Sequence, residues 1–293
     1  MMSIGKKKNL LDRRRTVAER IAFIAGFCIL TLWALLLLYM LFWAVTSSFK
    51  TNIEYVLKPL ALPENLKFEN YKIGLEKFTY NGVNFTGMLY NSLWQTVGAV
   101  VVGQAVQLTT GYILAQYEFK GKNILFSIMV FGMIVPLYGS FASTYKLYFD
   151  LGLTSSYKIL IASLSGFNAT TLMTYAFFKG TPKELREAVF VDGGGDWVAY
   201  TKVYLPLAKN IFIAFFILGF ISGWNDYQTP LLYMDGMPTL SLGLYVFQQE
   251  IRYVANNPAY FAGSIMVCLP VVIMFVVFND KIMGQIYSGG LKG

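Results

Sequence analysis

Uncharged, apolar stretches recur along the chain and define its architecture. Residues 21–47, 78–117, 123–145 and 159–178 carry no charge, and residues 211–234 and 253–279 are interrupted by Asp226 alone. A helix that crosses the hydrocarbon core needs about 20 predominantly apolar residues, because the core offers the backbone no water. The pattern therefore predicts an all-α integral membrane protein with six transmembrane helices.

The same pattern divides the chain into segments. It predicts an N-terminal cytoplasmic segment over residues 1–20, a first transmembrane helix over 21–47 and an outer loop over 48–88. A core of five transmembrane helices follows over 89–282, with a long inner loop at 179–210, and a cytoplasmic tail covers 283–293. The first apolar stretch is longer than the 7–15 residues typical of a secretory signal, so we expect it to remain as a permanent helix.

The distribution of basic residues predicts the orientation. Six crossings place both termini on one side of the membrane, and Lys and Arg accumulate on the cytoplasmic side. If both termini are cytoplasmic, the inner segments hold sixteen of the 24 basic residues and the outer segments hold eight. We therefore expect a multi-pass protein of the cytoplasmic membrane with both termini inside.

Composition narrows the possible functions. The chain is 56% hydrophobic and 14% charged, and it has no histidine, the commonest general base and metal ligand. No G-x-x-x-x-G-K-[ST] phosphate loop is present, so we expect the chain to be no enzyme and to hold no cofactor or metal. The net charge of +8 is spread over the membrane edges, which indicates anionic lipid rather than nucleic acid as a partner.

The 179–210 loop has the pattern of a bent pair of helices. Thr181-Pro182-Lys183-Glu184 is typical of a capping box, which predicts that a short helix begins here. The run Gly193-Gly194-Gly195 would end that helix. Asp196 is a candidate cap for a second helical segment, which we expect to end at Leu205-Pro206.

Residues in this loop resemble a known family. Inner-membrane components of binding-protein-dependent ABC importers carry the signature E-A-A, three residues, G, nine residues, I, one residue, L-P. This chain has Glu187-Ala188-Val189, Gly193, Val203 and Leu205-Pro206 at the same intervals. Valine replaces alanine at 189 and isoleucine at 203, and both replacements keep apolar character.

Further landmarks extend the resemblance over nearly the whole chain, which is most similar to sugar permeases of the maltose-permease type. They are Ser47 to Lys50 at the end of the first helix, Pro63 to Tyr71, Asn91 to Leu93 at the start of the second helix, Tyr117 to Lys122, Pro136, Gly223 to Tyr227, and Gly289 to Gly293.

The resemblance implies a function and a set of partners. It implies a permease subunit for a sugar or oligosaccharide that works with a second homologous permease subunit, two ATPase subunits that bind ATP and Mg²⁺, and an extracytoplasmic solute-binding protein. The 181–206 loop would contact the ATPase and couple hydrolysis to transport. The coupling residues so implied are Glu187, Ala188, Val189, Asp192, Gly193, Val203, Leu205 and Pro206. Lys292 and Gly293 in the tail are implied as a further ATPase contact.

Two features of the fifth helix have competing interpretations. Asp226 is a carboxylate within an apolar stretch, which is costly unless it faces protein or water, so Asn225 and Asp226 are candidates for the solute pathway. Gly219 and Gly223 form a G-x-x-x-G pattern, which is typical of close helix packing.

Other functions stay open at this point. The cargo could be a non-sugar solute such as a polyol phosphate. A secondary transporter would need intramembrane ionisable groups, of which Asp226 is the single candidate. An integral-membrane enzyme would need clustered acid and base groups, whereas the 179–210 loop offers caps and glycines.

Overall fold

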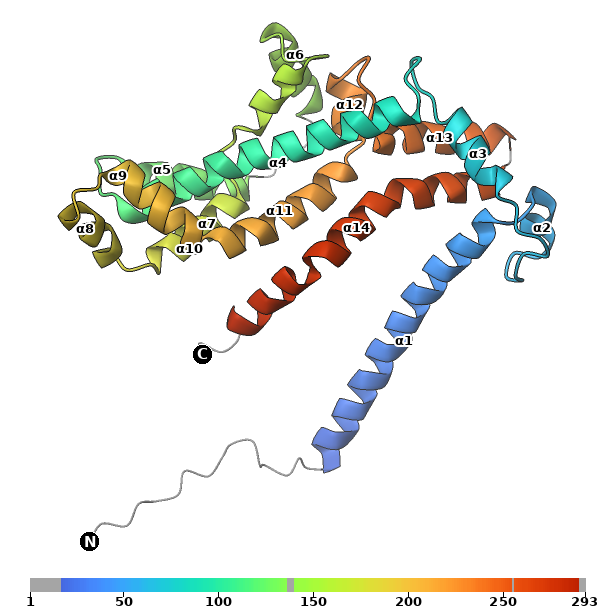
Figure 1. Ribbon diagram of the computed structural model, residues 1–293, viewed down its shortest axis with the longest axis horizontal. Helices are drawn as coiled ribbons and strands as arrows, with labels where there is room; N and C mark the ends of the chain where they lie inside the picture. Colours follow the sequence, from blue (N-terminus) through green and yellow to red (C-terminus); the bar gives the residue numbers. More distant parts are fainter. Residues whose placement is uncertain (1–16, 136–139, 255, 290–293) are drawn as a thin grey trace.

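The computed structural model describes residues 17–135, 140–254 and 256–289, in which the regular elements are helices apart from one bridge between Tyr80 and Val83. Long helices run between two ends of the molecule and short ones cover both ends (Figure 1). The chain begins with α1 (Val17–Ser48), α2 (Asn52–Leu57), α3 (Glu69–Lys77), α4 (Phe85–Gln116), α5 (Lys122–Ile134), α6 (Phe141–Asp150) and the 3₁₀ helix η2 (Tyr157–Ser163). It continues with α7 (Ala169–Lys179), α8 (Glu184–Val191), α9 (Asp196–Ala199), the π-helical turn η3 (Tyr200–Tyr204), α10 (Leu205–Leu207), α11 (Lys209–Trp224), α12 (Gln228–Tyr233), α13 (Leu240–Val254) and α14 (Asn257–Gly289).

The all-helical fold class is confirmed, and each predicted apolar stretch contains a helix. In the described ranges α1, α4 and α14 are long and apolar enough to cross a membrane, and the pair of Asp196–Leu207 and Lys209–Trp224, bent by 69°, has this length and composition when taken together. The stretch 123–145 divides into α5 and α6, and the stretch 159–178 divides into η2 and α7. The prediction of one continuous helix in each stretch was wrong. In the stretch 159–178, an internal cap starts α7. In the stretch 123–145, Pro136 lies outside the described residues.

Two asparagines start the helices that were expected to begin elsewhere. The Asn84 Oδ1 accepts a hydrogen bond from the Gly87 amide at 3.0 Å, so α4 begins at Phe85 and not at Asn91. The Asn168 Oδ1 accepts from the Thr171 amide at 3.0 Å and starts α7. At the other boundaries, α1 runs from Val17 to Ser48, and α14 extends through Gly289, so the predicted boundary at 282 falls within a helix.

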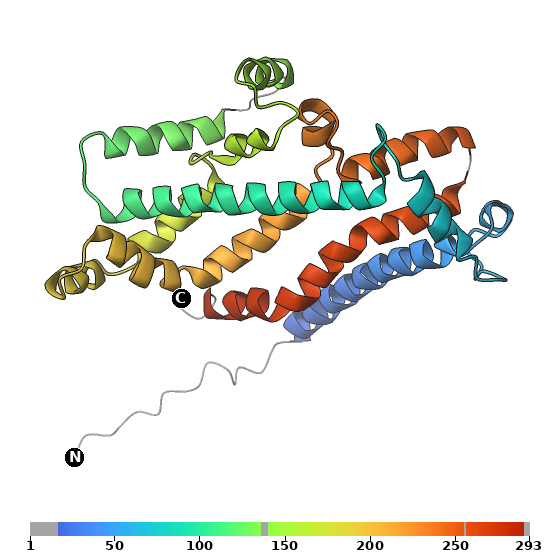
Figure 2. The ribbon, with the colours of Figure 1, turned by 45° about the horizontal axis from the view of Figure 1, so that its top comes forward.

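The centre of the molecule is α4, which packs against both α7 and α11 (Figure 2). Gly111 allows the closest approach, since a Cβ there would lie 2.3 Å from the Thr174 Oγ1 of α7. A Cβ on Gly219 or Gly223 would meet Val100 or Thr96 of α4 at 3.2 or 3.3 Å. The predicted role of this glycine pair in helix packing is therefore confirmed.

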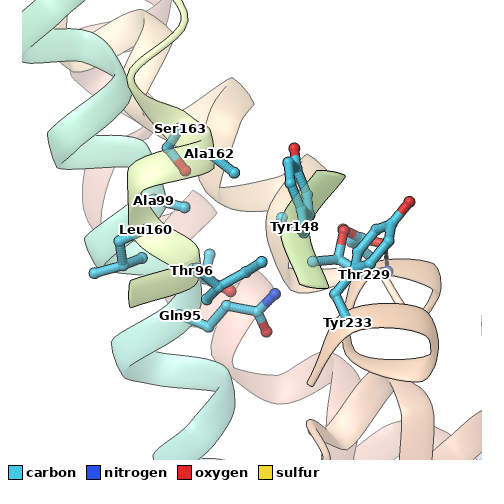
Figure 3. A pocket seen from close by; sticks show the side chains of 12 residues that line it. Gln95, Thr96, Ala99, Tyr148, Leu160, Ala162, Ser163, Thr229 and Tyr233 are labelled. Atoms are coloured by element: carbon cyan, nitrogen blue, oxygen red, sulfur yellow. Dashed lines mark hydrogen bonds between the residues drawn. The ribbon is translucent and has the colours of Figure 1, made fainter. Parts of the chain in front are cut away.

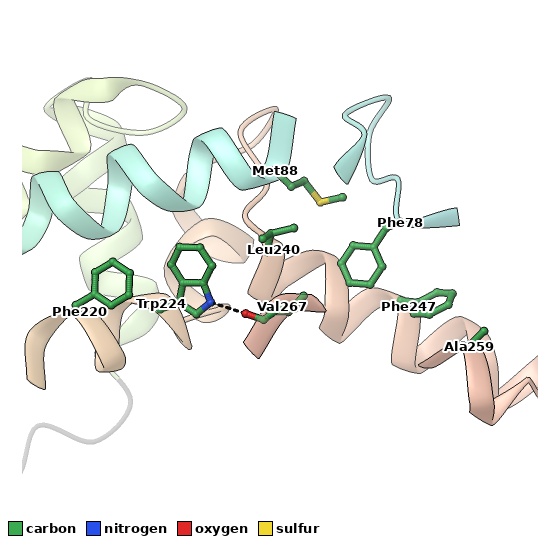
Figure 4. Packing of buried hydrophobic residues seen from close by; sticks show 8 residues of the cluster. All are labelled: Phe78, Met88, Phe220, Trp224, Leu240, Phe247, Ala259 and Val267. Atoms are coloured by element: carbon green, nitrogen blue, oxygen red, sulfur yellow. Dashed lines mark hydrogen bonds between the residues drawn. The ribbon is translucent and has the colours of Figure 1, made fainter. Parts of the chain in front are cut away.

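Buried side chains join four helices, and Phe78 after α3, near the end that carries α13, which we call the α13 end (Figure 4). Trp224 is 2% exposed, and its indole Nε1 donates to the Val267 carbonyl at 2.9 Å. The cluster consists of Phe78, Met88, Phe220, Trp224, Leu240, Phe247, Ala259 and Val267. It holds α4, α11, α13 and α14 together, while α1 packs against α14 near its C-terminal end and exposes apolar side chains elsewhere, as a lipid-facing helix does.

In the 49–84 loop at the α13 end, two of the segments that resemble the family contact each other. The Asn70 Nδ2 donates to the Ser48 and Lys50 carbonyls at 2.7 and 2.8 Å. Lys50 is 1% exposed, and its Nζ donates to the Lys58 and Pro59 carbonyls at 3.1 and 2.8 Å. The segments around residues 47–50 and 63–71, separated in sequence, thus form one structural unit.

Candidate functional site

The signature residues of the 179–210 loop lie at the opposite end of the molecule, which we call the α8 end (Figure 1). Here α8 projects beyond the end of α4, and α9, η3 and α10 lead back into α11. In the described chain α8 buries none of its side chains. Its surface is therefore available to another protein, and its orientation depends on the turns and polar contacts at its two ends.

The predicted capping box at the start of α8 is wrong. The Thr181 Oγ1 donates to the Phe177 carbonyl of α7 at 3.1 Å, and Lys183, which precedes α8, makes no side-chain cap. The Thr181 hydroxyl therefore completes the last turn of α7. The cap of α8 falls at Lys183, two residues after Thr181, and no side chain accepts a cap hydrogen bond there.

The helix α8 ends at the run of glycines, as predicted, and hydrogen bonds from two of them define its last turn. Gly193 has a φ of 81°, and its amide donates to the Phe190 carbonyl at 3.1 Å, while the Gly194 amide donates to the Val189 carbonyl at 2.8 Å. This pair of bonds is the Schellman motif, in which a left-handed residue satisfies the last carbonyls of a helix. Gly194 is also required, since a Cβ there would lie 3.0 Å from the Val189 carbonyl oxygen and 2.6 Å from its Cγ1.

Asp196 forms an ion pair instead of the predicted cap. Its Oδ1 accepts from the Arg186 Nε at 3.0 Å, from the Arg186 Nη2 at 2.7 Å and from the Tyr117 hydroxyl at 2.6 Å. These bonds, first from Tyr117 and then from Arg186, lower the pKa of the Asp196 carboxyl. Burial and the bond to Asp196 raise the pKa of Tyr117. The carboxylate is therefore charged at neutral pH and connects α8, α9 and the residue after α4.

A buried layer beneath this ion pair joins the same helices. Gln116, the last residue of α4, donates from its Nε2 to the Phe178 carbonyl at 2.7 Å and accepts at its Oε1 from the Tyr204 hydroxyl at 3.1 Å. Apolar side chains surround this pair, and the buried members are Leu108, Tyr112, Ala115, Phe178, Tyr200, Tyr204 and Ala208. The ends of α4 and α7 are thereby fixed to η3.

The second helical segment does not end at Leu205-Pro206, as predicted, but continues into α11. The Leu205 amide donates to the Tyr200 carbonyl, which gives a π-helical turn. Proline removes an amide and crowds the carbonyl four residues earlier, and this wider turn directly precedes Pro206. The chain then bends by 69° at the junction of α10 and α11, where Ala208 is fully buried.

The structure divides the predicted coupling residues into two groups. Glu187, Ala188 and Asp192 are exposed on α8 or at its end, beside Gly193, and Val189 is half-buried against Gly194. Val203 and Leu205 pack against the buried cluster, and Pro206 is exposed. Lys292 and Gly293 lie outside the described residues.

Asp226 lines a cavity of about 270 Å³, and Figure 3 shows other side chains around it, among them Gln95, Tyr148 and Tyr233. The Asp226 Oδ1 accepts from the amides of Gln228 and Thr229 at 2.9 and 3.0 Å, which starts α12. The lining also includes Gln95, Thr96, Tyr148, Ser163, Thr229 and Tyr233. Asn225 is not among the lining residues, and its Nδ2 donates to the Ile221 carbonyl at 2.8 Å.

A second cavity, of about 580 Å³, follows the first along α4. Ala99, Ser163 and Gly223 line both cavities. Gln95 lines the first and Gln104 the second, and the Oε1 of each is buried without a hydrogen-bond partner in the described chain. Among the described residues, no three His, Cys, Asp or Glu side chains are grouped as a metal site.

Sequence reasoning missed Arg186, Tyr117, Gln116 and Tyr204. Tyr117 stood in a landmark turn, but the sequence contained no sign that it would reach Asp196, 79 residues away. Arg186 lies ten residues before Asp196, a spacing that matches no helical contact. These contacts could be predicted only from the conformation of the glycine turn between Arg186 and Asp196.

Comparisons with known proteins agree with this geometry. Residues 107–279 match the family model described as binding-protein-dependent transport system inner membrane component. The diacetylchitobiose uptake system permease protein NgcG of Streptomyces coelicolor is 27% identical, covering 96% of this chain and 93% of the relative. The arabinooligosaccharides transport system permease protein AraQ of Bacillus subtilis is 28% identical, covering 94% of this chain and 96% of the relative.

A solved structure shares the fold. The chain superposes with a TM-score of 0.73 and 23% identity on a chain of a bacterial ABC transporter involved in the import of the acidic polysaccharide alginate. The match covers 91% of this chain and 98% of that chain.

Proposed function

Because the chain belongs to the family of binding-protein-dependent transport system inner membrane components, we propose that it carries a sugar or oligosaccharide across the cytoplasmic membrane and that its 181–206 loop couples this transport to ATP hydrolysis. Membership in the family makes it the membrane-spanning permease subunit of an ABC importer, with ATPase and solute-binding protein partners. ATP and Mg²⁺ are bound by the ATPase subunits. The α8 end faces the cytoplasm, together with both termini.

The exposed α8 is the observation that carries the coupling role. Its carboxylate Glu187 and its apolar Val191, which is 87% exposed, are available for contact, although α8 belongs to a loop that is otherwise fixed at both ends. Eight helical residues extend only about 12 Å, so α8 can enter a groove of an ATPase subunit as one short body. A displacement of α8 would reach α11 through η3 and α10, and closure of rigid elements of this kind underlies alternating access.

The two cavities support a sugar as the solute. Amide and hydroxyl groups of Gln95, Thr96 and Ser163 can exchange hydrogen bonds with sugar hydroxyls, and the rings of Tyr148 and Tyr233 can pack against the apolar faces of a sugar. The names of the two relatives given above describe diacetylchitobiose uptake and arabinooligosaccharide transport. Asp226 belongs to the pathway wall in this proposal, whereas Asn225 terminates α11.

The proposed assembly pairs this chain with a second, homologous permease subunit and two ATPase subunits. The second cavity is lined by α4, α7 and α11, and a facing permease would complete the solute pathway between the two subunits. The tail residues Lys292 and Gly293 would contact the ATPase pair from the same side as α8.

Reconstitution with its ATPase subunits, partner permease and binding protein in proteoliposomes tests the proposal. Loaded binding protein should stimulate ATP hydrolysis, and labelled di- or oligosaccharide should accumulate only with ATP. Glu187→Lys places a cation where the ATPase expects a carboxylate, so ATPase association or stimulated hydrolysis should fall by about tenfold or more. Glu76→Lys on α3, at the α13 end, makes the same charge change and should leave both unchanged.

Each alternative gives a different result in the same experiment. Uptake of a polyol phosphate with no sugar uptake would contradict the sugar substrate. Uptake that persists without ATPase subunits would favour a secondary transporter, and normal stimulation in Glu187→Lys would contradict the coupling role of the loop.

A further inference from the structure

Three side chains outside the family signature form a closed triad at the α8 end. The Arg186 guanidinium donates through two nitrogens to the Asp196 Oδ1, at 3.0 and 2.7 Å. Its central carbon lies 4.1 Å from the centroid of the Tyr117 ring, and the Tyr117 hydroxyl donates to the same Oδ1 at 2.6 Å. Each member of the triad therefore contacts the other two.

The triad connects three parts of the chain, two of which are separated by a turn of three glycines. Arg186 belongs to α8, Asp196 begins α9, and Tyr117 directly follows α4. Between the first two lies Gly193-Gly194-Gly195, and glycine permits more backbone conformations than any other residue. Since α8 buries no side chain, apolar packing within this chain does little to fix its angle to α9.

We propose that the Arg186–Asp196–Tyr117 triad holds α8 and α9 as one rigid unit against the end of α4, so that a displacement of α8 moves α4 instead of bending the glycine turn. This role rests on the proposed coupling function of the loop. Arg186 is a positioning residue in this scheme, because it acts through Asp196 and Tyr117 and leaves the exposed contact surface of α8 to Glu187 and its neighbours.

The chemistry of the triad suits a mechanical link. An arginine that donates two hydrogen bonds to a carboxylate and stacks on an aromatic ring is confined in direction as well as in distance. Burial is partial, with side-chain exposures of 26% for Arg186 and 52% for Asp196. Below the triad, Gln116 and Tyr204 join α4 to η3, so α4 is connected to the loop at two levels.

This link can be measured in the reconstituted transporter by the transport ratio, which is the number of solute molecules taken up per ATP hydrolysed. Arg186→Gln should assemble with the ATPase and hydrolyse ATP at the basal rate, but the transport ratio should fall by about fivefold or more. Asp196→Asn should behave similarly, and Tyr117→Phe should cause a smaller loss because the ring remains. The charge swap Arg186→Asp with Asp196→Arg should recover part of the ratio.

Lys183 provides a matched control on the same helix end. Its Nζ lies 3.7 Å from a Glu118 carboxylate oxygen, both side chains are more than half exposed, and exposed pairs of this kind contribute little. Lys183→Gln should keep the wild-type ratio. An Arg186→Gln variant with the wild-type ratio, or a charge swap no better than the single variants, would overturn the triad proposal.

The Glu187→Lys result separates this proposal from the function on which it rests. If Glu187→Lys loses ATPase association while Arg186→Gln transports normally, the coupling loop stands and the triad proposal fails. If neither variant differs from wild type, the coupling function itself fails. Should Arg186→Gln reduce assembly, Tyr117→Phe provides the same measurement with only a hydroxyl removed.

Discussion

The 49–84 loop and the 179–210 loop lie at opposite ends of the molecule and are stabilised in different ways. In the 49–84 loop, side chains bond mainly to backbone carbonyls, as Lys50 does to Lys58 and Pro59 and Asn70 does to Ser48 and Lys50. In the 179–210 loop, the decisive bonds join side chains from separate helices, as in the Arg186–Asp196–Tyr117 triad.

The contrast is instructive because one sequence pattern occurs in both loops. Thr51 and Glu54 form a complete capping box, with the Glu54 amide 3.2 Å from the Thr51 Oγ1 and the Thr51 amide 2.7 Å from the Glu54 Oε2. Thr181 and Glu184 have the same spacing and form none. The first box stabilises the start of α2 within the 49–84 loop. The second threonine donates to α7 instead, so the orientation of α8 depends on the triad and on the glycine turn at its end.

Replacing Lys50 should produce the largest change in stability. Lys50→Met would leave the Lys58 and Pro59 carbonyls without this donor in a buried place, at a cost of about 3 kcal/mol. We expect a clear fall in the thermal unfolding temperature of the purified protein, followed by tryptophan fluorescence. Lys67→Met removes an exposed cation from the same loop and should change little. Equal effects of the two changes would contradict the structural role of Lys50.

Two of the glycines after α8, Gly193 and Gly195, should respond differently to the same substitution. Gly193→Val forces a β-branched residue into the left-handed region, at about 1–2 kcal/mol, and should weaken stimulated ATP hydrolysis while leaving membrane insertion normal. Gly195→Val is the control, since its φ is −104° and no atom lies within 4 Å of its Cβ position. If Gly195→Val impaired hydrolysis as strongly, the loop would depend on general flexibility and not on the left-handed turn.

The paired threonines give the smallest and most direct comparison. Thr51→Ala should destabilise α2 by about 1 kcal/mol, because the Glu54 amide loses its cap. Thr181→Ala removes one bond to a carbonyl of α7 and should leave hydrogen exchange in the first turn of α8 unchanged. Faster exchange of the Glu184 amide in Thr181→Ala would show that this capping box forms in solution.

Several features were predictable because they depend on residues close together in the chain. Long apolar stretches are enough to identify membrane helices, and a glycine after a short amphipathic helix is enough to predict its left-handed exit. The spacing from Glu187 to Pro206 identified the family, although it contained no information on which of these side chains would be exposed.

Other features depended on how distant segments approach one another. The same threonine pattern had two outcomes because α7 ends beside Thr181, and Asp196 became an ion-pair partner because the glycine turn brings Arg186 over Tyr117.

The sequence by itself determined that this chain is a helical membrane protein, which stretches contain its apolar helices and where α8 ends. Only the tertiary structure decided that Lys50 is buried, that two apolar stretches break, and that α4 is connected to the coupling loop through Gln116 and Tyr117. The physical reason is the distance along the chain over which each effect acts. Hydrophobic length and backbone preference act within a few residues, whereas a polar side chain bonds to whichever partner the packing of α4, α7 and α11 brings within about 3 Å.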